Sequence, residues 1–402
     1  MNPIRQHLID PEICIRCNTC EEMCPIDAIT HNDDNYLVNA QICDLSMECI
    51  APCPTGAIDN WRLVERPYTL EQQGEWEELP PPQASVETPD AEVEALQSEA
   101  DGMLELAHAG EGGRAVAPAS AARPSVKLYT RDKPALAVVQ GNVRITDPGV
   151  ASDVHHIILD LGSSALPVLE GQSVGVIPPG IDQNGKPHIM RLYSIASPRD
   201  GERPNHNNIA LTVKRVAYKV DGKTVNGIAS NYLCDLQRGD RVNLTGPFGS
   251  SFLMPNDPAA NIIMICTGTG SAPFRAMTER RRRHMPDAPG RLLLFFGART
   301  RGELPYFGPL TKLPASLIDR ELVFSRETQG NKEYVQHRML KRGADIALLL
   351  QEENTHIFLC GLKAMDQGVL AALERICREH GMAWSSLSQT MRENGRFHVE
   401  TY

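Results

Sequence analysis

The sequence predicts a multidomain protein that combines α+β and α/β architecture, and three observations support this. Seven of the 11 cysteines fall within the first 53 residues. Residues 126–255 contain short, evenly spaced β-rich runs, which are typical of an antiparallel barrel. Residues 256–402 alternate apolar strand-like runs with helical stretches, which indicates a Rossmann-like parallel sheet. We therefore expect a cysteine-rich domain over 1–65, a linker over 66–125, and then these two larger domains.

Composition is that of a soluble globular protein, with 402 residues, 42% hydrophobic and 22% charged. No apolar run approaches the ~20 residues of a membrane span, and the N-terminus lacks the apolar core of a signal peptide. We expect a cytoplasmic protein with no membrane partner. The net charge of −10 arises from twelve acidic residues between Pro67 and Gly113, a stretch without Lys or Arg. The remaining chain is close to neutral, so nothing favours nucleic-acid binding.

The predicted linker is acidic and rich in Pro and Ala. It contains PPP at 80–82 and AVAPASAARPS at 115–125. Apolar residues at helical spacing between Glu92 and Ala107 allow a short helix, and the alternative is a flexible tether.

The first group of cysteines has the spacing C-x2-C-x2-C-x3-C-P. In two-cluster bacterial ferredoxins the fourth cysteine of such a run binds the other cluster. Three thiolates on one tight loop can hold three corners of an iron–sulfur cube, and the fourth comes from a distant segment. A zinc site is the alternative, but it favours two separated C-x2-C pairs. The cysteines of this group are Cys14, Cys17, Cys20 and Cys24.

The second group repeats this spacing with Ser46 in the place of one cysteine. Crossed ligation predicts a first 4Fe–4S cluster on Cys14, Cys17, Cys20 and Cys53, and a second cluster on Cys24, Cys43 and Cys49. The fourth corner of the second cluster could be the Ser46 oxygen, the Asp44 carboxylate, a non-protein ligand or no iron. A hard oxygen matches this site poorly, so the second cluster is 4Fe–4S or 3Fe–4S. The alternative is that the second cluster is absent.

Two segments of the predicted barrel have groups that suit a flavin. Arg191, Tyr193 and Ser194 share one strand and offer a guanidinium, a ring and a hydroxyl. Further on, Gly227 and Ser230 open a helix, whose N-terminus can bind a pyrophosphate. The alternatives are an ordinary barrel edge and an ordinary helix cap.

The last domain carries signals for a dinucleotide. The turn TGTG at 267–270 joins a strand to a helix, where glycines let the backbone approach a pyrophosphate. A polar group at the end of a later strand would fit a 2′-phosphorylated adenosine, with a solvated loop as the alternative. Its residues are Ser325, Arg326, Lys332 and Tyr334. Cys360 alone reads as a core cysteine, and Tyr402 alone as a frayed end.

Taken in order, these segments closely resemble the plant-type ferredoxin–NADP+ reductase family. The resemblance covers about residues 128–402 and includes EGQSVGVIPPG, RLYS, LTVKRVAY, GIASNYLCDL, TGTGSAPFR, SRET, CGLKAM and HVETY. It implies an NADPH-dependent flavoprotein oxidoreductase, with FAD on the barrel and NADP(H) on the α/β domain.

The resemblance also implies roles for single residues. Tyr193 and Tyr402 would stack on the two faces of the flavin, Ser194 would lie by its N5, and Tyr218 would stack on the adenine. The catalytic residues would be Ser194, Cys360, Glu400 and Tyr402. The remaining cofactor-binding residues would be Arg191, Val213, Lys214, Gly227, Ser230, Thr269, Gly270, Ser325, Arg326, Lys332, Tyr334 and Gly361. Lys332 stands where the family commonly has Arg, which weakens bidentate phosphate recognition.

The whole arrangement is similar to that of the reductase components of benzoyl-CoA 2,3-epoxidases. This resemblance implies that electrons pass from NADPH to FAD, to the clusters and to a separate oxygenase component in aerobic degradation of aromatic compounds. One alternative is a general ferredoxin–NADP+ reductase running in either direction. Another is an electron-transfer subunit whose iron–sulfur domain mainly docks a larger complex. The oligomeric state stays open, a homodimer included.

Overall fold

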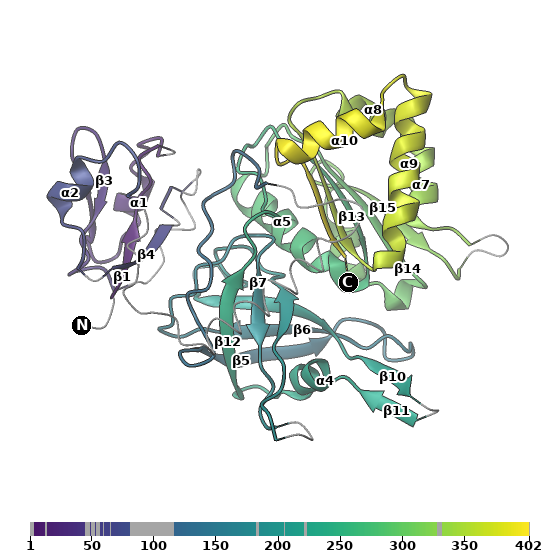
Figure 1. Cartoon of the computed structure of the whole chain (residues 1–402), viewed down its shortest axis with the longest axis horizontal. Helices are drawn as coiled ribbons and strands as arrows, with labels where there is room; N and C mark the ends of the chain where they lie inside the picture. The colour runs from purple at the N-terminus through teal and green to yellow at the C-terminus, as the bar shows by residue number, and fades with distance from the viewer. Residues whose placement is uncertain are drawn as a thin grey trace.

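A computed structural model describes most of the chain as three folded parts (Figure 1). The described residues are 4–12, 14–44, 49, 53, 57–58, 60–64, 66–80, 116–181, 185–204, 206–220, 223–327 and 332–401. Ser46, Tyr402 and the predicted helix between Glu92 and Ala107 lie outside these ranges. Figure 1 shows the N-terminal part beside the other two, which carry the barrel and the parallel sheet.

The N-terminal part is built from two small antiparallel pairs. Strand β1 (Ile4–Leu8) pairs with β4 (Asn60–Val64), and β2 (Ile29–His31) pairs with β3 (Tyr36–Val38). Helix α1 (Thr19–Glu22) carries the third cysteine of the first group.

A short helix from the predicted linker range folds onto this part. Helix α2 (Leu70–Gly74) begins with a capping box formed by Thr69 and Gln72. The amide of Gln73 then binds both backbone groups of Val38, at 2.9 and 3.0 Å. Because these bonds satisfy buried polar groups, residues 66–80 are held against the N-terminal part.

The middle part is a six-stranded antiparallel sheet in the order β8-β7-β12-β5-β6-β9. Its edge strands meet through a bridge between Ile195 and Leu211, so the sheet closes into the expected barrel-like form. A hairpin and helix α4 (Ile228–Asp235) project from it. The strands are β5 (Ala135–Arg144), β6 (Val154–Asp160), β7 (Ser173–Val176), β8 (Arg191–Ser194), β9 (Asn208–Lys214), β10 (Ala217–Val220), β11 (Lys223–Asn226) and β12 (Arg241–Phe248).

The C-terminal part is a five-stranded parallel sheet in the order β15-β14-β13-β16-β17. Four of its strands are the apolar runs NIIMICT, RLLLFFGA, ELVFSRE and HIFLCG that alternate with helical stretches in the sequence, and a five-residue strand near the end of the chain adds a fifth. The strands are β13 (Asn261–Thr267), β14 (Leu292–Ala298), β15 (Asp319–Phe324), β16 (Thr355–Gly361) and β17 (Phe397–Thr401). The helices are η1 (Gly268–Gly270), α5 (Ser271–His284), η2 (Arg301–Glu303), α6 (Phe307–Lys312), α7 (Val335–Lys341), α8 (Gly343–Leu350), η3 (Lys363–Met365), α9 (Asp366–Glu379) and α10 (Trp384–Glu393).

Helices cover both faces of this parallel sheet. Along β13, Ile263 and Ile265 face the core under α7, α8 and α9, whereas Met264 and Cys266 face the core under α5. This alternation is why the strand is apolar throughout. The apolar pattern over 334–350 is typical of one continuous helix, but the segment forms two helices that meet at Arg342. The guanidinium of Arg342 binds carboxylates from β15 and α8.

A buried polar group fixes the barrel to the C-terminal part. Arg275 of α5 donates two hydrogen bonds of 2.6 Å to the Glu202 carboxylate. Burial acts to raise the pKa of Glu202, but hydrogen bonds from His156 and Arg275 outweigh it and lower this pKa to about 2. The Tyr306 hydroxyl contacts Thr212 Oγ1 at 2.6 Å and His156 Nδ1 at 2.9 Å. The two parts therefore share a charged, hydrogen-bonded joint.

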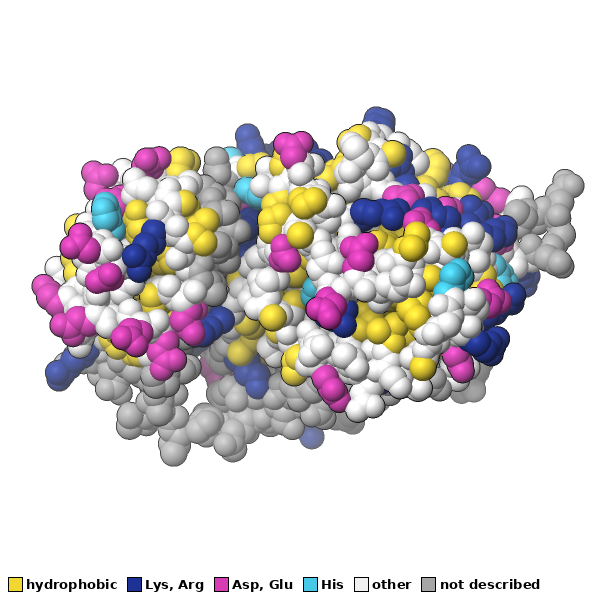
Figure 2. All heavy atoms as spheres, turned by 90° about the horizontal axis from the view of Figure 1, so that it is seen from above, with side chains coloured by type: hydrophobic (Ala, Val, Ile, Leu, Met, Phe, Trp, Pro, Cys, Tyr) yellow, Lys and Arg dark blue, Asp and Glu magenta, His cyan; other side chains and the backbone are white. Residues whose placement is uncertain are grey.

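The surface of the N-terminal part is acidic. Figure 2 shows Asp and Glu side chains gathered over it at the left, whereas Lys and Arg are frequent toward the right. Exposed acidic residues of this part are Glu12, Glu22, Asp27, Asp33, Asp34, Asp44, Glu71, Glu75, Glu77 and Glu78. Across the described ranges, no helix has the length and apolar character needed to cross a bilayer.

Candidate functional site

Two cavities of about 300 Å³ each lie in the N-terminal part, and the cysteines divide between them. One cavity, the first cluster cavity, is lined by Cys14, Cys17, Cys20 and Cys53. The other, the second cluster cavity, is lined by Cys24, Cys43 and Cys49. This is the crossed arrangement that the spacing predicts.

The thiols of each cavity also affect one another. Burial, together with the nearby Cys53 and Cys14 thiols, raises the pKa of Cys20 to about 12. Burial also raises the pKa of Cys49, and the Cys43, Cys24 and Cys20 thiols add to this rise. Thiolates this close repel one another unless a cation lies between them. The donor sets therefore fit iron–sulfur clusters, with four thiolates for one and three for the other.

The second cluster cavity is also lined by Asp44 and by His7, a residue that the sequence reasoning missed. Asp44 is exposed, whereas His7 is buried on β1. The Nε2 atom of His7 donates to the carbonyl of Ile58, and its Nδ1 lies 3.9 Å from Cys49 Sγ. Burial lowers the pKa of His7 to about 4, although the contact with Ile58 opposes this. A lone histidine in a strand carries no spacing signal, so only the fold places it here.

Strand β8 carries three predicted flavin residues. It pairs with β7 so that Tyr193 lies beside Val174 and Ser194 beside Ser173. Arg191 is exposed and donates to the Met190 carbonyl at 2.9 Å. The Tyr193 ring packs against the barrel core, and burial raises the pKa of its hydroxyl. The strand thus presents an exposed guanidinium next to a half-buried ring.

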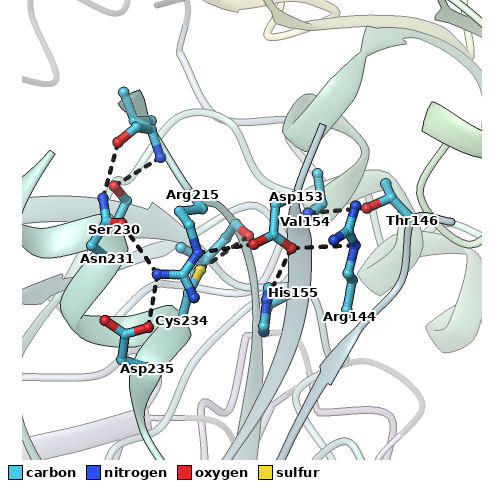
Figure 3. A network of polar contacts seen from close by, with 12 residues as sticks. Arg144, Thr146, Asp153, Val154, His155, Arg215, Ser230, Asn231, Cys234 and Asp235 are labelled. Atoms are coloured by element: carbon cyan, nitrogen blue, oxygen red, sulfur yellow. Dashed lines mark hydrogen bonds and ion pairs between the residues drawn. The ribbon is translucent and has the colours of Figure 1, made fainter. Parts of the chain in front are cut away.

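The start of α4 is held by a polar network (Figure 3). Ser230 Oγ accepts from the Val216 amide at 3.2 Å and donates to the Gly227 carbonyl at 3.3 Å. Arg215 bonds Asp153 at 2.9 Å, Asn231 at 3.1 Å and Asp235 at 2.7 Å. These bonds tie the helix to β6 and β9, so the predicted pyrophosphate position is rigid.

Three further predicted residues lie near this end of the barrel. Val213 is fully buried in the barrel core, so its side chain cannot reach a ligand and only its backbone could. Lys214 follows it and is exposed. Tyr218 is 51% exposed on the β10–β11 hairpin, away from the core. Their contacts with FAD remain predictions.

The glycine turn and the end of β16 approach each other closely. A Cβ on Gly270 would lie 2.2 Å from the Cys360 carbonyl oxygen, and one on Gly361 would lie 2.8 Å from Thr267 Oγ1. Gly361 also has φ of 144°, a conformation that side chains disfavour. Thr269 is the middle residue of the turn Gly268–Gly270. Glycine is therefore required here, because the backbones of the turn and of β16 pack directly against each other.

Two of the four predicted catalytic residues are neighbours. In the parallel register, Cys360 lies beside Cys266 on one side and Glu400 on the other. Burial raises the pKa of Cys360, and the Glu400 charge adds to this. Burial alone raises the pKa of Glu400 to about 8, so its carboxyl keeps a proton at neutral pH. Ser194 lies on the barrel at the end of β8, and Tyr402 lies outside the described residues.

The predicted 2′-phosphate residues lie in the stretch of chain between β15 and α7. The amides of Ser325 and Arg326 donate to the carbonyls of Ala298 and Arg299, at 3.0 and 2.8 Å. Lys332 and Tyr334 precede α7 and are exposed. Arg299, which the sequence reasoning missed, is half exposed at the end of β14. The sequence feature that could have pointed to Arg299 is the basic run RTR at 299–301, which directly follows a strand.

Comparison with known proteins bears on all three parts. Family models match at residues 7–30 (4Fe-4S binding domain), 146–252 (oxidoreductase FAD-binding domain) and 264–370 (oxidoreductase NAD-binding domain). A ferredoxin–NADP reductase of Thermosynechococcus vestitus is 40% identical over 289 residues, which is 69% of this chain and 75% of that protein. The chain belongs to the ferredoxin–NADP reductase family.

Another member of the family matches this chain to a similar extent. The ferredoxin–NADP reductase of Synechocystis is 37% identical over 287 residues, covering 69% of this chain and 70% of that protein. A ferredoxin–NADP+ reductase structure from Plasmodium falciparum with 2′P-AMP has a TM-score of 0.55 at 23% identity, over 69% of this chain and 99% of that chain. That likeness shows the shared fold. This family member is therefore an NAD(P)-dependent flavoprotein oxidoreductase, with a 4Fe–4S binding domain at its N-terminus.

Proposed function

We propose that this chain takes electrons from NADPH and delivers them, through its own iron–sulfur domain, to a separate protein. The observation that carries this proposal is the division of seven cysteines between two cavities in a chain that also contains the reductase. When bound, FAD accepts a pair of electrons from a nicotinamide and releases them singly, as iron–sulfur clusters require. A built-in iron–sulfur domain raises the effective concentration of the first acceptor, to about millimolar for a short flexible tether.

The residues at the carboxyl edge of the parallel sheet suit the nicotinamide end of NADPH. Gly270 and Gly361 let the glycine turn approach the end of β16, and the protonated Glu400 places no charge beside Cys360. Ser325, Arg326 and Lys332 supply donors for a 2′-phosphate beyond β15. We infer a preference for NADPH over NADH, with Tyr402 covering the flavin until the nicotinamide displaces it.

Flavin binding falls to the barrel. Arg191 and the start of α4 would hold the pyrophosphate, and Tyr193 would stack on the ring. Ser194 would lie next to the reacting edge of the flavin. The polar network around Arg215 fixes α4, which is what a preformed cofactor site needs.

The acceptor that we propose is the oxygenase component of a benzoyl-CoA epoxidase. The order of an iron–sulfur domain, an acidic linker and a reductase supports this choice. The acidic surface of the N-terminal part also suits a protein acceptor with a basic docking face (Figure 2). The rival is a general ferredoxin–NADP+ reductase, which the names of the related proteins favour.

A reconstituted assay separates the two functions. The holoprotein is mixed with NADPH, oxygen, benzoyl-CoA and a purified di-iron oxygenase, and epoxide formation is measured against NADPH consumption. Stoichiometric coupling that is lost in Cys17→Ala, but kept in Cys377→Ala, supports the proposal, because Cys377 lies outside both cluster cavities. NADPH production from a reduced ferredoxin, without coupling to the oxygenase, would instead support the general reductase.

A further inference from the structure

A buried arginine of the C-terminal part reaches the first cluster cavity. Arg280 lies on α5 and is only 1% exposed. Its Nη2 donates to the carbonyl of Cys53 at 3.4 Å. Cys53 is the one cysteine of the second group that lines the first cluster cavity. The contact therefore joins the reductase to a predicted ligand of one cluster.

The same guanidinium belongs to a buried group of charges. The Glu170 carboxylate is completely buried and accepts from Arg199 Nε at 3.0 Å and Arg199 Nη2 at 2.8 Å. Burial acts to raise the pKa of Glu170, but the charges of Arg199 and then Arg280 outweigh it and lower this pKa. Two guanidinium groups therefore flank one ionised carboxylate. Arg280 thus places a positive charge next to the Cys53 carbonyl.

Further contacts seat the N-terminal part on the reductase around this point. Ala165 of the barrel packs into the N-terminal apolar cluster that contains Ile9, Cys20 and Cys53. Arg123 binds the buried carboxylate of Asp10 at 3.4 Å and Glu12 at 2.5 Å. Both cluster cavities are lined by N-terminal residues. The contact of Arg280 with Cys53 is what places the first cluster cavity next to the reductase.

We propose that Arg280 is a positioning residue that holds Cys53 against the reductase and favours the reduced state of the first cluster, making this cluster the entry point for electrons. The proposal rests on the function proposed above. Reduction of a cluster adds one electron and one negative charge without forming or breaking a bond, and the electron originates from NADPH. A positive charge in a low-dielectric interior stabilises the more negative state.

Substitutions of opposite sign test this idea in the full-length holoprotein. Potentials of both clusters are measured by redox titration followed by EPR, and cluster reduction by NADPH is followed by stopped-flow absorbance. We expect Arg280→Met to move the first cluster to a more negative potential and to slow cluster reduction several-fold, with Arg280→Lys in between. The second cluster and the rate of flavin reduction should not change. Arg282→Met is the matched control, because Arg282 is an exposed residue of the same helix that pairs with Glu279.

Glu170→Gln removes the negative charge of the buried group and gives a prediction of the opposite direction. The first cluster should move to a less negative potential, and this variant decides the matter if Arg280→Met loses its cluster or fails to fold. An unchanged first-cluster potential in Glu170→Gln, or in a folded Arg280→Met that keeps its cluster, would overturn the proposal and leave Arg280 a structural arginine. If wild-type clusters stay oxidised with NADPH while the flavin is reduced, the proposed function itself fails, which is a distinct outcome.

Discussion

Cys360 and Glu400 lie side by side on adjacent parallel strands, and both are buried at the carboxyl edge of the sheet. The pairing places a thiol and a protonated carboxyl next to the glycine turn that we expect to receive NADP(H). A neutral pair at this position avoids the cost of a buried charge. The energetic consequence can be measured through pH.

Glu400→Gln should make the protein less sensitive to alkaline pH. Burial raises the pKa of Glu400 to about 8, above the 4.5 of an ordinary Glu. Between these values the folded protein holds a proton that the unfolded chain lacks, so wild-type stability falls as pH rises, by at most about 1.4 kcal/mol per pH unit. Unfolding free energies from pH 6 to 8.5 should show this slope in the wild type and not in Glu400→Gln. The exposed Glu393→Gln is the control, and parallel curves for all three proteins would contradict the account.

Gly270→Ala should destabilise the protein and abolish tight NADPH binding. The new Cβ would meet the backbone of Cys360, which cannot move without distorting β16. We expect a loss of about 2 kcal/mol or more in unfolding free energy and a large rise in the KM for NADPH. Gly308→Ala is matched, because no atom lies within 4 Å of its added Cβ. Equal behaviour of the two variants would refute the close approach.

Arg326→Gln should weaken NADPH binding without affecting NADH. A charge-assisted hydrogen bond to a phosphate contributes about 1.5–3 kcal/mol, which corresponds to at least a tenfold rise in KM. Steady-state kinetics with both nucleotides checks this, with Lys341→Gln as the control because Lys341 is exposed and pairs with Glu333. Equal losses for both nucleotides would argue against 2′-phosphate recognition.

Tyr306→Phe should loosen the joint between the barrel and the C-terminal part. The change removes hydrogen bonds to Thr212 and His156 and leaves their polar atoms buried. We expect a loss of about 1–3 kcal/mol in unfolding free energy, measured by denaturant titration. Tyr232→Phe should cost far less, since its hydroxyl donates to the Arg241 carbonyl through a long contact of 3.5 Å. If the two changes cost the same, the joint does not depend on Tyr306.

Ser46→Cys should complete the second set of thiolates. The variant would then give a second four-iron signal by EPR, where the wild type has only three thiolates at this cavity. Asp44→Asn serves as the control for an oxygen ligand. An EPR spectrum that Ser46→Cys leaves unchanged would mean that residue 46 does not face the second cluster.

Much of the fold could be predicted because its strands are long and regular. The strands around Ile263 and Phe358 are apolar throughout, as expected for a parallel sheet that is covered on both faces. Strand β17 and helix α10 escaped prediction because the strand has only five residues and the helix follows a long helical stretch with no strand between them. The break between α7 and α8 at Arg342 could not be predicted, because the apolar pattern continues across it. The break is accompanied by ion pairs between Arg342 and β15, which is distant in the sequence.

The division of the cysteines between two cavities could be predicted from spacing alone, since crossed ligation is built into the cysteine pattern. Neighbours that belong to other segments could not. His7 contacts the second cluster cavity only because β1 pairs with β4, and Arg280 is 227 positions away from Cys53. Such contacts depend on packing between parts of the chain, which periodicity does not encode.

The most direct test of the account is anaerobic stopped-flow absorbance of the holoprotein mixed with NADPH. We predict rapid bleaching of the flavin, followed by loss of iron–sulfur absorbance in the same molecules, at a rate independent of protein concentration. Flavin that bleaches while the clusters remain oxidised would contradict transfer from the reductase to its own iron–sulfur domain.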